Sequence, residues 1–162
     1  MGSSIQKHNI SPLYNSNSQV LILGSFPSVK SREQSFFYGH PQNRFWLTLA
    51  NLLKCDVPSS IEQKKSMLLD HNIALWDVIK CCEISGSSDS SIKNVEPNDL
   101  TIILSQCNIK KIFANGKASQ TLFNKYIKPE LKREIILLPS TSPANAAYSV
   151  ERLIVEWGKI LD

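Results

Sequence analysis

Short, continuously apolar runs alternate along this chain with segments in which apolar residues recur at helical spacing. The apolar runs predict four buried strands, over residues 20–26, 73–79, 111–115 and 134–138. The helical spacing predicts five helices, over residues 43–54, 60–70, 97–107, 118–127 and 149–161. Strands that are apolar throughout and separated by helices are typical of a parallel sheet covered on both faces. The pattern therefore predicts an α/β fold of three layers, α/β/α, around a central parallel four-stranded sheet.

A single domain is expected, because no internal repeat or low-complexity linker divides the chain. We assign this domain to residues 20–162 and treat residues 1–19 as an N-terminal segment. That segment opens with Met1-Gly2-Ser3-Ser4, which is typical of an expression tag. Residues 81–96 and 139–147 are predicted to be loops, because they are rich in polar residues.

Composition narrows the class of protein. With 162 residues, of which 42% are hydrophobic, the chain is long enough to bury a sizeable core, but its apolar runs are far too short to span a bilayer. Its first residues lack the layout of a secretory signal. We therefore expect a cytoplasmic monomer that does not contact membranes and that associates with the nucleoid if its source is prokaryotic. The net charge of +4 is compatible with nucleic-acid binding but does not require it.

The spacing of the four cysteines argues against the common metal sites. Cys81 and Cys82 are adjacent, and Cys55 and Cys107 stand alone, so no Cys-x-x-Cys pair is available for zinc or an iron–sulfur cluster. We expect buried, reduced thiols, and neither a metal nor a cofactor.

Polar residues follow or end each of the predicted strands. They belong to the segments Gly24-Ser25-Phe26, Trp76-Asp77, Asn115-Gly116 and Pro139-Ser140-Thr141-Ser142. The carboxyl ends of parallel strands lie along one edge of a sheet, which is where open α/β folds bind their ligands. These four segments are therefore predicted to converge on one cleft.

A phosphate-binding loop over residues 24–31 is one alternative interpretation of the first of these segments. The segment begins with Gly24 and ends in Lys30-Ser31, as such loops do. However, Val29 occupies the position of the second glycine, and Pro27 has no N–H to offer a phosphate. The alternative is disfavoured for these reasons.

Three motifs resemble the uracil-DNA glycosylase superfamily, and especially its hypoxanthine-DNA glycosylase branch. They are Gly24-Ser25-Phe26-Pro27-Ser28, the segment Tyr-Gly-His-Pro-x-Asn-Arg-Phe-Trp at 38–46, and Leu-Pro-Ser-Thr-Ser-Pro-Ala-Asn at 138–145. The resemblance extends over about residues 20–148. It implies the fold of that superfamily and a monofunctional DNA-repair enzyme that flips a deaminated base out of DNA and hydrolyses its bond to deoxyribose. It implies hypoxanthine as the preferred base and uracil as the second, without a cofactor.

Two positions depart from the pattern of the better-known branches. Phe26 occupies the place of an Asp or Asn that positions water, and Leu138 occupies the place of a His that stabilises the leaving base. The resemblance implies that Asn43 supplies the catalytic carboxamide instead, and its carbonyl oxygen is expected to orient water. The alternative for Asn43 is an N-cap of the helix that begins at Arg44, since Asn is favoured there.

The base pocket is expected to contain two kinds of group. Aromatic residues such as Phe26, Phe37 and Tyr38 could stack on a base, or could belong to the core. Asp77 could accept a hydrogen bond from a base N–H, or could cap a helix, and His40 could polarise a base oxygen or stabilise its own turn. The full set of predicted pocket residues is Gly24, Ser25, Phe26, Pro27, Tyr38, His40 and Asp77.

The loop after the last strand is expected to contact DNA. It offers hydroxyls for phosphates and a proline that could enter the gap left by a flipped base, or it could simply cap the last helix. The predicted DNA-binding residues are Ser140, Thr141, Ser142, Pro143, Asn145 and Lys117, with Lys30, Arg32 and Arg44 as further candidates for contacts with phosphate. A rival function is a catalytically silent nucleic-acid-binding module, because Phe26 and Leu138 have removed two familiar catalytic groups.

Overall fold

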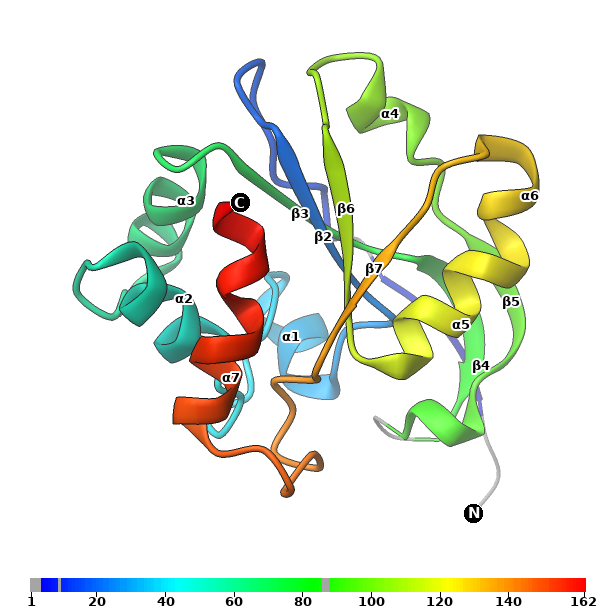
Figure 1. Cartoon of the computed structure of the whole chain (residues 1–162). Helices are drawn as coiled ribbons and strands as arrows, with labels where there is room; N and C mark the ends of the chain where they lie inside the picture. Colours follow the sequence, from blue (N-terminus) through cyan, green and yellow to red (C-terminus); the bar gives the residue numbers. More distant parts are fainter. Residues whose placement is uncertain (1–3, 9, 86–87) are drawn as a thin grey trace.

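The computed structural model describes residues 4–8, 10–85 and 88–162 and contains a central parallel sheet of four strands. The strands are β2 (Val20–Gly24), β3 (Ile73–Asp77), β6 (Lys111–Asn115) and β7 (Ile136–Leu138), in the spatial order β3-β2-β6-β7. Helices cover both faces of this sheet (Figure 1). The predicted α/β/α fold with a parallel four-stranded sheet is confirmed.

The register of the strands follows from their apolar sequences. All five residues of β3 are buried, as are four of the five in β2, because helices lie on both sides of the sheet. Gly24 lies opposite Asp77, and Asn115 lies opposite Leu138. The register therefore brings the polar strand ends to the same edge of the sheet.

The helices divide between the two faces. Figure 1 shows α2 (Phe45–Leu53), α3 (Ile61–Leu69) and α7 (Val150–Trp157) on one side, and α5 (Lys117–Tyr126) and α6 (Lys128–Leu131) on the other. The short helix α1 (Val29–Gln34) lies at the carboxyl edge of the sheet, as does the segment after β7. The opposite edge carries α4 (Thr101–Leu104), and a 3₁₀ turn (Gly158–Leu161) extends α7.

A second, antiparallel sheet corrects the prediction of a loop over residues 81–96. It consists of β1 (Ser4–Lys7), β4 (Ile79–Ile84) and β5 (Lys93–Pro97), in the order β1-β4-β5, and a 3₁₀ turn (Asp89–Ser91) lies between β4 and β5. The predicted strand over 73–79 ends at Asp77, so that Ile79 begins β4 instead. The polar residues of β4 and β5 concealed the pattern, because one face of an antiparallel sheet tolerates solvent.

The described residues of the N-terminal segment lie against the rest of the domain. Strand β1 pairs with β4, and Ile10 and Leu13 are buried in the core. Leu13 also forms an isolated antiparallel bridge with Leu75 of β3. The core thus includes residues that precede position 20.

Two further predicted elements are shorter than expected, and one helix was not predicted. The predicted helix over 97–107 is reduced to the single turn of α4, and the last strand begins at Ile136 instead of residue 134. Helix α1 was not predicted, because it has only six residues and a polar sequence; the Ser28 hydroxyl caps it by accepting from the Ser31 N–H at 3.1 Å. Such short elements depend on contacts that periodicity does not reveal.

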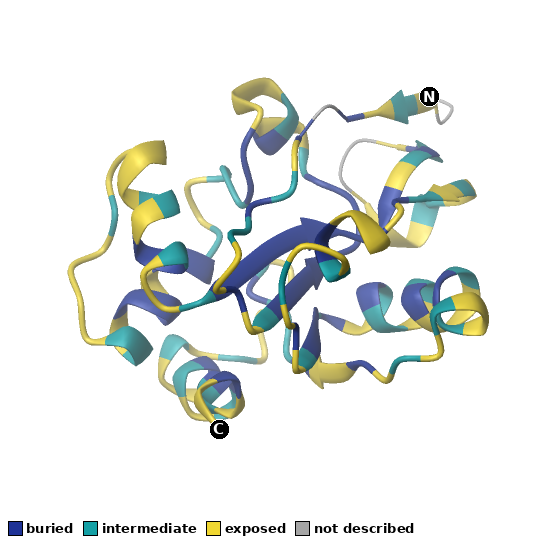
Figure 2. Ribbon diagram, turned by 90° about the horizontal axis from the view of Figure 1, so that it is seen from above, coloured by how far each residue is buried: buried dark blue, intermediate teal, exposed yellow. Residues whose placement is uncertain are grey.

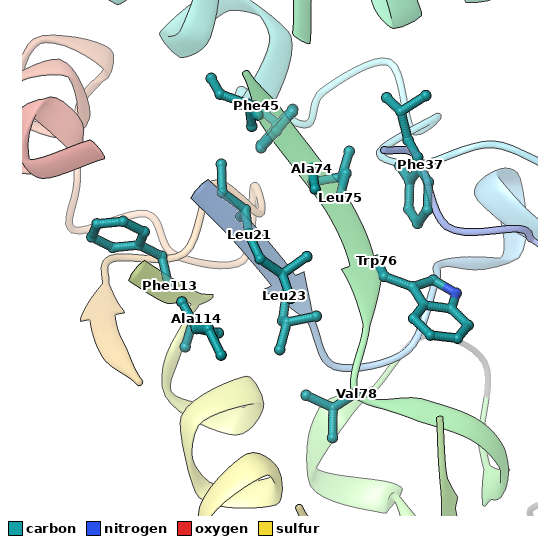
Figure 3. Packing of buried hydrophobic residues seen from close by; sticks show 14 of the residues in the cluster. Leu21, Leu23, Phe37, Phe45, Ala74, Leu75, Trp76, Val78, Phe113 and Ala114 are labelled. Atoms are coloured by element: carbon teal, nitrogen blue, oxygen red, sulfur yellow. The ribbon is translucent and has the colours of Figure 1, made fainter. Parts of the chain in front are cut away.

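The hydrophobic core surrounds β2. Figure 3 shows Leu21 and Leu23 of β2 between side chains of β3 and of β6. Trp157 of α7 contacts Phe45 of α2 edge to face, with ring centroids 5.7 Å apart, and its indole N–H donates to the Pro139 carbonyl at 2.8 Å. The last helix is thereby joined both to α2 and to the end of β7. Figure 2 shows that buried residues concentrate in the sheet and on the inner faces of the helices.

Two further findings concern membrane-spanning helices and the cysteines. None of the helices in the described part of the chain is long and apolar enough to cross a membrane. All four cysteines are free thiols, but only Cys82 is buried, and Cys55 is exposed. The expectation of uniformly buried thiols is therefore wrong for Cys55, which lies just after α2.

Replacing Leu153 by Ala should lower the free energy of unfolding by about 2–5 kcal/mol, because this side chain is fully buried on the inner face of α7. Val155 of the same helix is 76% exposed, and its replacement by Ala should change the free energy by less than about 0.5 kcal/mol. Urea unfolding followed by circular dichroism measures both values. Equal losses would contradict this packing of α7.

Candidate functional site

A small cavity of about 120 Å³ lies at the carboxyl edge of the parallel sheet. It is much smaller than the roughly 300–1,000 Å³ of pockets for drug-sized ligands. All four strand ends contribute to it, as the sequence predicts. Its lining consists of Gly24, Ser25, Phe26, Pro27, Ser28, Ser31, Phe37, Tyr38, Asn43, Asp77, Asp89, Asn115, Ser140 and Ser142.

Gly24 leaves room for two polar atoms at the inner end of the cavity. A Cβ atom at this position would lie 2.5 Å from Asp77 Oδ1 and 3.2 Å from the Tyr38 hydroxyl. The first distance is far below a van der Waals contact, so any side chain at position 24 would displace Asp77. The absence of a side chain is what allows the carboxylate and the phenol to face the same space.

One carboxylate oxygen of Asp77 and the hydroxyl of Tyr38 are buried without hydrogen-bond partners in the described part of the chain. Neither Asp77 Oδ2 nor the Tyr38 hydroxyl has one within the described residues, and Asp77 is only 3% exposed. The Asn115 carboxamide approaches the Tyr38 hydroxyl but makes no hydrogen bond of ordinary geometry with it. Unpaired polar atoms are costly in a protein interior, and their presence beside a cavity indicates that a ligand completes them.

Burial sets the ionisation of both groups. Burial, and secondly the charge of Asp89, raises the pKa of Asp77 to about 7. Burial also raises the pKa of Tyr38 well above its usual range, and the neighbouring Asp77 raises it further. Tyr38 is therefore a neutral hydroxyl donor, whereas Asp77 changes its charge close to neutral pH.

Tyr38 is held in place from two sides. Its ring stacks on Phe45 with centroids 4.2 Å apart, and its carbonyl accepts from the Trp46 indole N–H at 3.2 Å. Its backbone has a φ of 50°, in the left-handed region that is uncommon for residues other than Gly. The hydroxyl is thus aimed by the backbone of its own turn and by the start of α2.

Phe26 lines the cavity, but other side chains also contact its ring. His8 meets the ring edge to face at 5.4 Å, and the Arg32 guanidinium lies 5.1 Å from the ring centroid. His8 Nδ1 accepts from the Ile10 N–H, so its Nε2 carries the proton and donates to the Ile79 carbonyl at 2.8 Å. Burial lowers the pKa of His8. The predicted pocket residue Phe26 is therefore supported by a neutral histidine that sequence reasoning missed.

Asn43 faces the cavity with a carboxamide whose oxygen is already used. Its Oδ1 accepts from the Phe45 backbone N–H at 3.0 Å and from the Thr141 hydroxyl at 2.9 Å. The first bond satisfies the N–H of the first residue of α2, but the N-cap residue of this helix is Arg44, so the alternative role of Asn43 as the N-cap is wrong. The expectation that this oxygen orients water is corrected, because both of its lone pairs have partners. The Nδ2 amide group is what Asn43 has left for a ligand.

Arg44 does not face phosphate, in contrast to its prediction as a phosphate-binding residue. Its guanidinium donates to three backbone carbonyls of the loop after β7: Tyr148, Ser142 at 2.8 Å and Asn145 at 3.0 Å. This loop is thereby fixed to the start of α2. Lys30, another predicted phosphate contact, forms an exposed ion pair with Glu33 at 3.7 Å.

The residues of this loop have different environments. Thr141 is fully buried and bonded to Asn115 and Asn43, so its predicted contact with DNA is corrected. Ser140 accepts from the Ser142 N–H at 3.1 Å, and Asn145 Nδ2 donates to the Ser140 carbonyl at 3.0 Å. These bonds leave Pro143 exposed at the loop tip.

A larger hollow of about 640 Å³ adjoins the cavity and shares Asp89, Ser140 and Ser142 with it. Lys117 at the start of α5, together with Asn145 and Tyr148, also lines this hollow.

His40, predicted for the base pocket, lies outside the lining of the cavity. It borders another hollow, of about 360 Å³, that also includes Tyr38 and Asn43, and its Nδ1 accepts from the Gln42 N–H.

Four lining residues were not among the predicted site residues: Ser28, Ser31, Asp89 and Asn115, although Asn115 belongs to a strand end that was predicted to reach the cleft. Asp89, on the turn between β4 and β5, accepts from the Ser25 hydroxyl at 2.7 Å, and burial raises its pKa. Asn115 ends β6 and binds Thr141. Its place at a strand end was the available signal, whereas Asp89 lay in a predicted loop. Leu138 is fully buried, so no polar group replaces the missing histidine at that position.

The charged and sulfur-containing side chains do not form a metal centre in the part of the chain that the structure describes, since no three His, Cys, Asp or Glu residues are grouped suitably there. The functional groups that line the cavity are a buried carboxyl group, a phenol, carboxamides and serine hydroxyls, together with aromatic rings.

Comparison with known proteins identifies relatives over most of the chain. Residues 11–157 match the family model described as "Uracil DNA glycosylase superfamily". The chain is 36% identical over 117 residues to a hypoxanthine DNA glycosylase of Methanosarcina barkeri, covering 71% of this chain and 74% of that protein. It is 33% identical over 151 residues to one of Methanosarcina acetivorans, covering 90% and 92%. A solution NMR structure of a candidate uracil DNA glycosylase from M. acetivorans superposes with a TM-score of 0.79 and 27% identity, covering 98% of this chain and 100% of that one.

Replacing Asp77 by Asn should make the protein more stable at and above pH 7. The pKa of about 7 in the folded state exceeds the ordinary value of 3.8, so between these values the folded protein holds a proton that the unfolded chain has lost. The wild type should therefore lose stability as the pH rises through this window, by about 1.4 kcal/mol for each pKa unit. Urea unfolding at pH 5 and pH 8 measures the difference. A variant with the same dependence on pH as the wild type would show that Asp77 is not buried as described.

Proposed function

This chain belongs to the uracil DNA glycosylase superfamily and is a DNA N-glycosylase, and we propose that it removes hypoxanthine from DNA. The observation that carries the proposal is the pair of buried, unpartnered atoms on Asp77 and Tyr38 at the inner end of the cavity. The relatives named hypoxanthine DNA glycosylase support the same substrate. Uracil is proposed as a second substrate.

The hydrogen-bonding pattern of a deaminated base suits this pair. Deamination of adenine replaces an exocyclic amine by a carbonyl and converts the adjacent ring nitrogen into an N–H. Hypoxanthine therefore presents an N–H donor beside an acceptor, and adenine presents the reverse. The Asp77 carboxylate can accept from the N–H while the Tyr38 hydroxyl donates to the carbonyl, which is how flipped bases are commonly recognised. Uracil has the same donor and acceptor order on a smaller ring.

The base must leave the helix to reach these groups. The glycosidic bond cannot be attacked within the base stack, so such enzymes turn the nucleotide out into a pocket. A cavity of about 120 Å³ between the segments that carry Phe26 and Phe37 suits one planar base better than a larger ligand. Stacking of a base on an aromatic ring contributes about 1–3 kcal/mol.

Asn43 contributes to the reaction through its N–H groups. In hydrolysis the bond from the sugar to the base nitrogen breaks with its electron pair leaving on the base, and water attaches to the sugar carbon. The free Asn43 amide can donate to the base as this negative charge develops, in the manner of an oxyanion hole. Since Phe26 and Leu138 offer no polar group, we propose catalysis by positioning and charge stabilisation instead of by a strong general base.

The loop tip is proposed to stabilise the flipped state. Arg44 holds the loop by three carbonyls, so Pro143 projects from a rigid support. Apolar residues inserted between bases are a common means of holding DNA in a distorted state. Lys117 lines the adjoining hollow, which supports its proposed contact with a phosphate.

Replacing Tyr38 by Phe tests the proposed hydrogen bond from the Tyr38 hydroxyl to the carbonyl of hypoxanthine. The variant loses only a hydroxyl that has no partner, so its melting temperature should equal or exceed that of the wild type. Its rate of hypoxanthine release from an inosine-containing duplex should fall about tenfold, the equivalent of one lost hydrogen bond of about 1.4 kcal/mol. Single-turnover rates on inosine, uracil and adenine oligonucleotides measure the effect. A wild type that binds these DNAs but releases no base would support the silent binding module instead.

Replacing Pro143 by Gly should slow base release from duplex DNA much more than from single strands. Flipping costs a few kcal/mol in a duplex, where the base must be unpaired and leaves a gap opposite its partner. A single strand has no partner base, so it offers no such gap for Pro143 to fill. Pro129→Gly is the matched control, because Pro129 is an exposed proline in α6, on the other face of the sheet. Its rates should match those of the wild type. An equal loss on both forms of DNA for Pro143→Gly would assign the loop to folding or catalysis.

A further inference from the structure

Thr141 connects two asparagines from distant parts of the chain. Its hydroxyl accepts from Asn115 Nδ2 at 3.0 Å and donates to Asn43 Oδ1 at 2.9 Å, and its backbone N–H donates to Asn115 Oδ1 at 3.1 Å. Thr141 is fully buried, whereas Asn43 and Asn115 both line the cavity. The three side chains come from the segment before α2, the end of β6 and the loop after β7.

The direction of each hydrogen bond in this relay, by which we mean the bonded series Asn115, Thr141 and Asn43, is determined. The Thr141 N–H can only donate, so the Asn115 atom that it meets is the oxygen, and Nδ2 is the atom turned to the Thr141 hydroxyl. That hydroxyl must accept there, and its single hydrogen remains for Asn43 Oδ1. The Phe45 N–H donates to the same oxygen. A flipped Asn43 carboxamide would place its NH₂ group against the Phe45 N–H, which can only donate.

We propose that Thr141 is a positioning residue, which holds the Asn43 carboxamide with its N–H groups toward the cavity. The inference rests on the proposed function, because it gives those N–H groups a leaving base to stabilise. Removing the Thr141 hydroxyl takes away one of the two donors that keep the Asn43 oxygen turned inward. The Phe45 N–H alone then holds the carboxamide, which can turn away from its position, and misplacement of a group by about 1 Å can cost about 10²-fold in rate.

The test compares three variants of similar volume. Thr141→Val removes the hydroxyl, Thr141→Ser keeps it, and Thr48→Val is the matched control. Thr48 is as fully buried as Thr141, but its hydroxyl has no hydrogen-bond partner in the described part of the chain. Single-turnover base release from an inosine-containing duplex gives the rate of the chemical step, and titration with the same DNA gives its affinity.

Thr141→Val should slow the chemical step by about 10²-fold with little change in DNA affinity, whereas Thr141→Ser and Thr48→Val should retain rates close to that of the wild type. In an Asn43→Ala background the same Thr141→Val change should have no further effect, because the group that it positions is gone. A Thr141→Val enzyme as fast as Thr48→Val, or a full additional loss in the Asn43→Ala background, would overturn the proposal.

A second readout does not depend on catalysis. In ¹H–¹⁵N NMR spectra the Asn43 side-chain amide signals should keep their positions in Thr141→Ser and Thr48→Val, and should shift or broaden in Thr141→Val. Unchanged signals in Thr141→Val would contradict the positioning role whatever the activity. The wild type could be inactive on inosine-containing DNA while the Asn43 amide signals respond to the Thr141 variants as expected. That result would contradict the proposed substrate but not the positioning of Asn43 by Thr141.

Discussion

The central position of β2 in the parallel sheet is the constraint on which the site depends. Its parallel pairing with β3 places Gly24 beside Asp77, and its pairing with β6 brings Asn115 to the same edge. A shift of one residue in either register would turn every buried side chain to the opposite face. Because the strands are buried on both sides, such a shift would disrupt the whole core, so the stability of the sheet also fixes the geometry of the cavity.

The hydrogen-bond donors that line the cavity are neutral groups, and they lie beside the carboxyl groups of Asp77 and Asp89. Phe26 and Leu138 are both buried, so the two positions at which related enzymes are expected to carry polar groups belong to the hydrophobic surroundings here. The remaining donors are a phenol and carboxamides whose orientations are set by other residues. In surroundings of low polarity a correctly aimed dipole is worth more than in water. Precision of placement can therefore compensate in part for the absence of a strong acid or base.

The predictable features of this protein are those that depend on local pattern. The central strands were foreseen because each has an apolar centre, and their polar ends indicated the edge at which the cavity lies. The β1-β4-β5 sheet was missed because its strands contain many polar residues and are only partly buried. The Asn43 oxygen was expected to orient water, whereas in the folded chain it accepts from the hydroxyl of Thr141, 98 residues further along the chain, a contact that no local pattern reveals. Similarly, the sequence shows Arg44 as a charge near a possible DNA surface, and only the folded chain shows that backbone carbonyls surround it.

The bonds from Arg44 also have a consequence for biosynthesis. The partners of its guanidinium are the carbonyls of Ser142, Asn145 and Tyr148, which follow Arg44 by 98, 101 and 104 residues. A nascent chain that still lacks them can already contain β2, β3 and β6, but it has neither the loop nor the bond from Thr141 to Asn43. The start of α2 and the loop beside the cavity are consequently joined only after these three strands of the sheet have been synthesised.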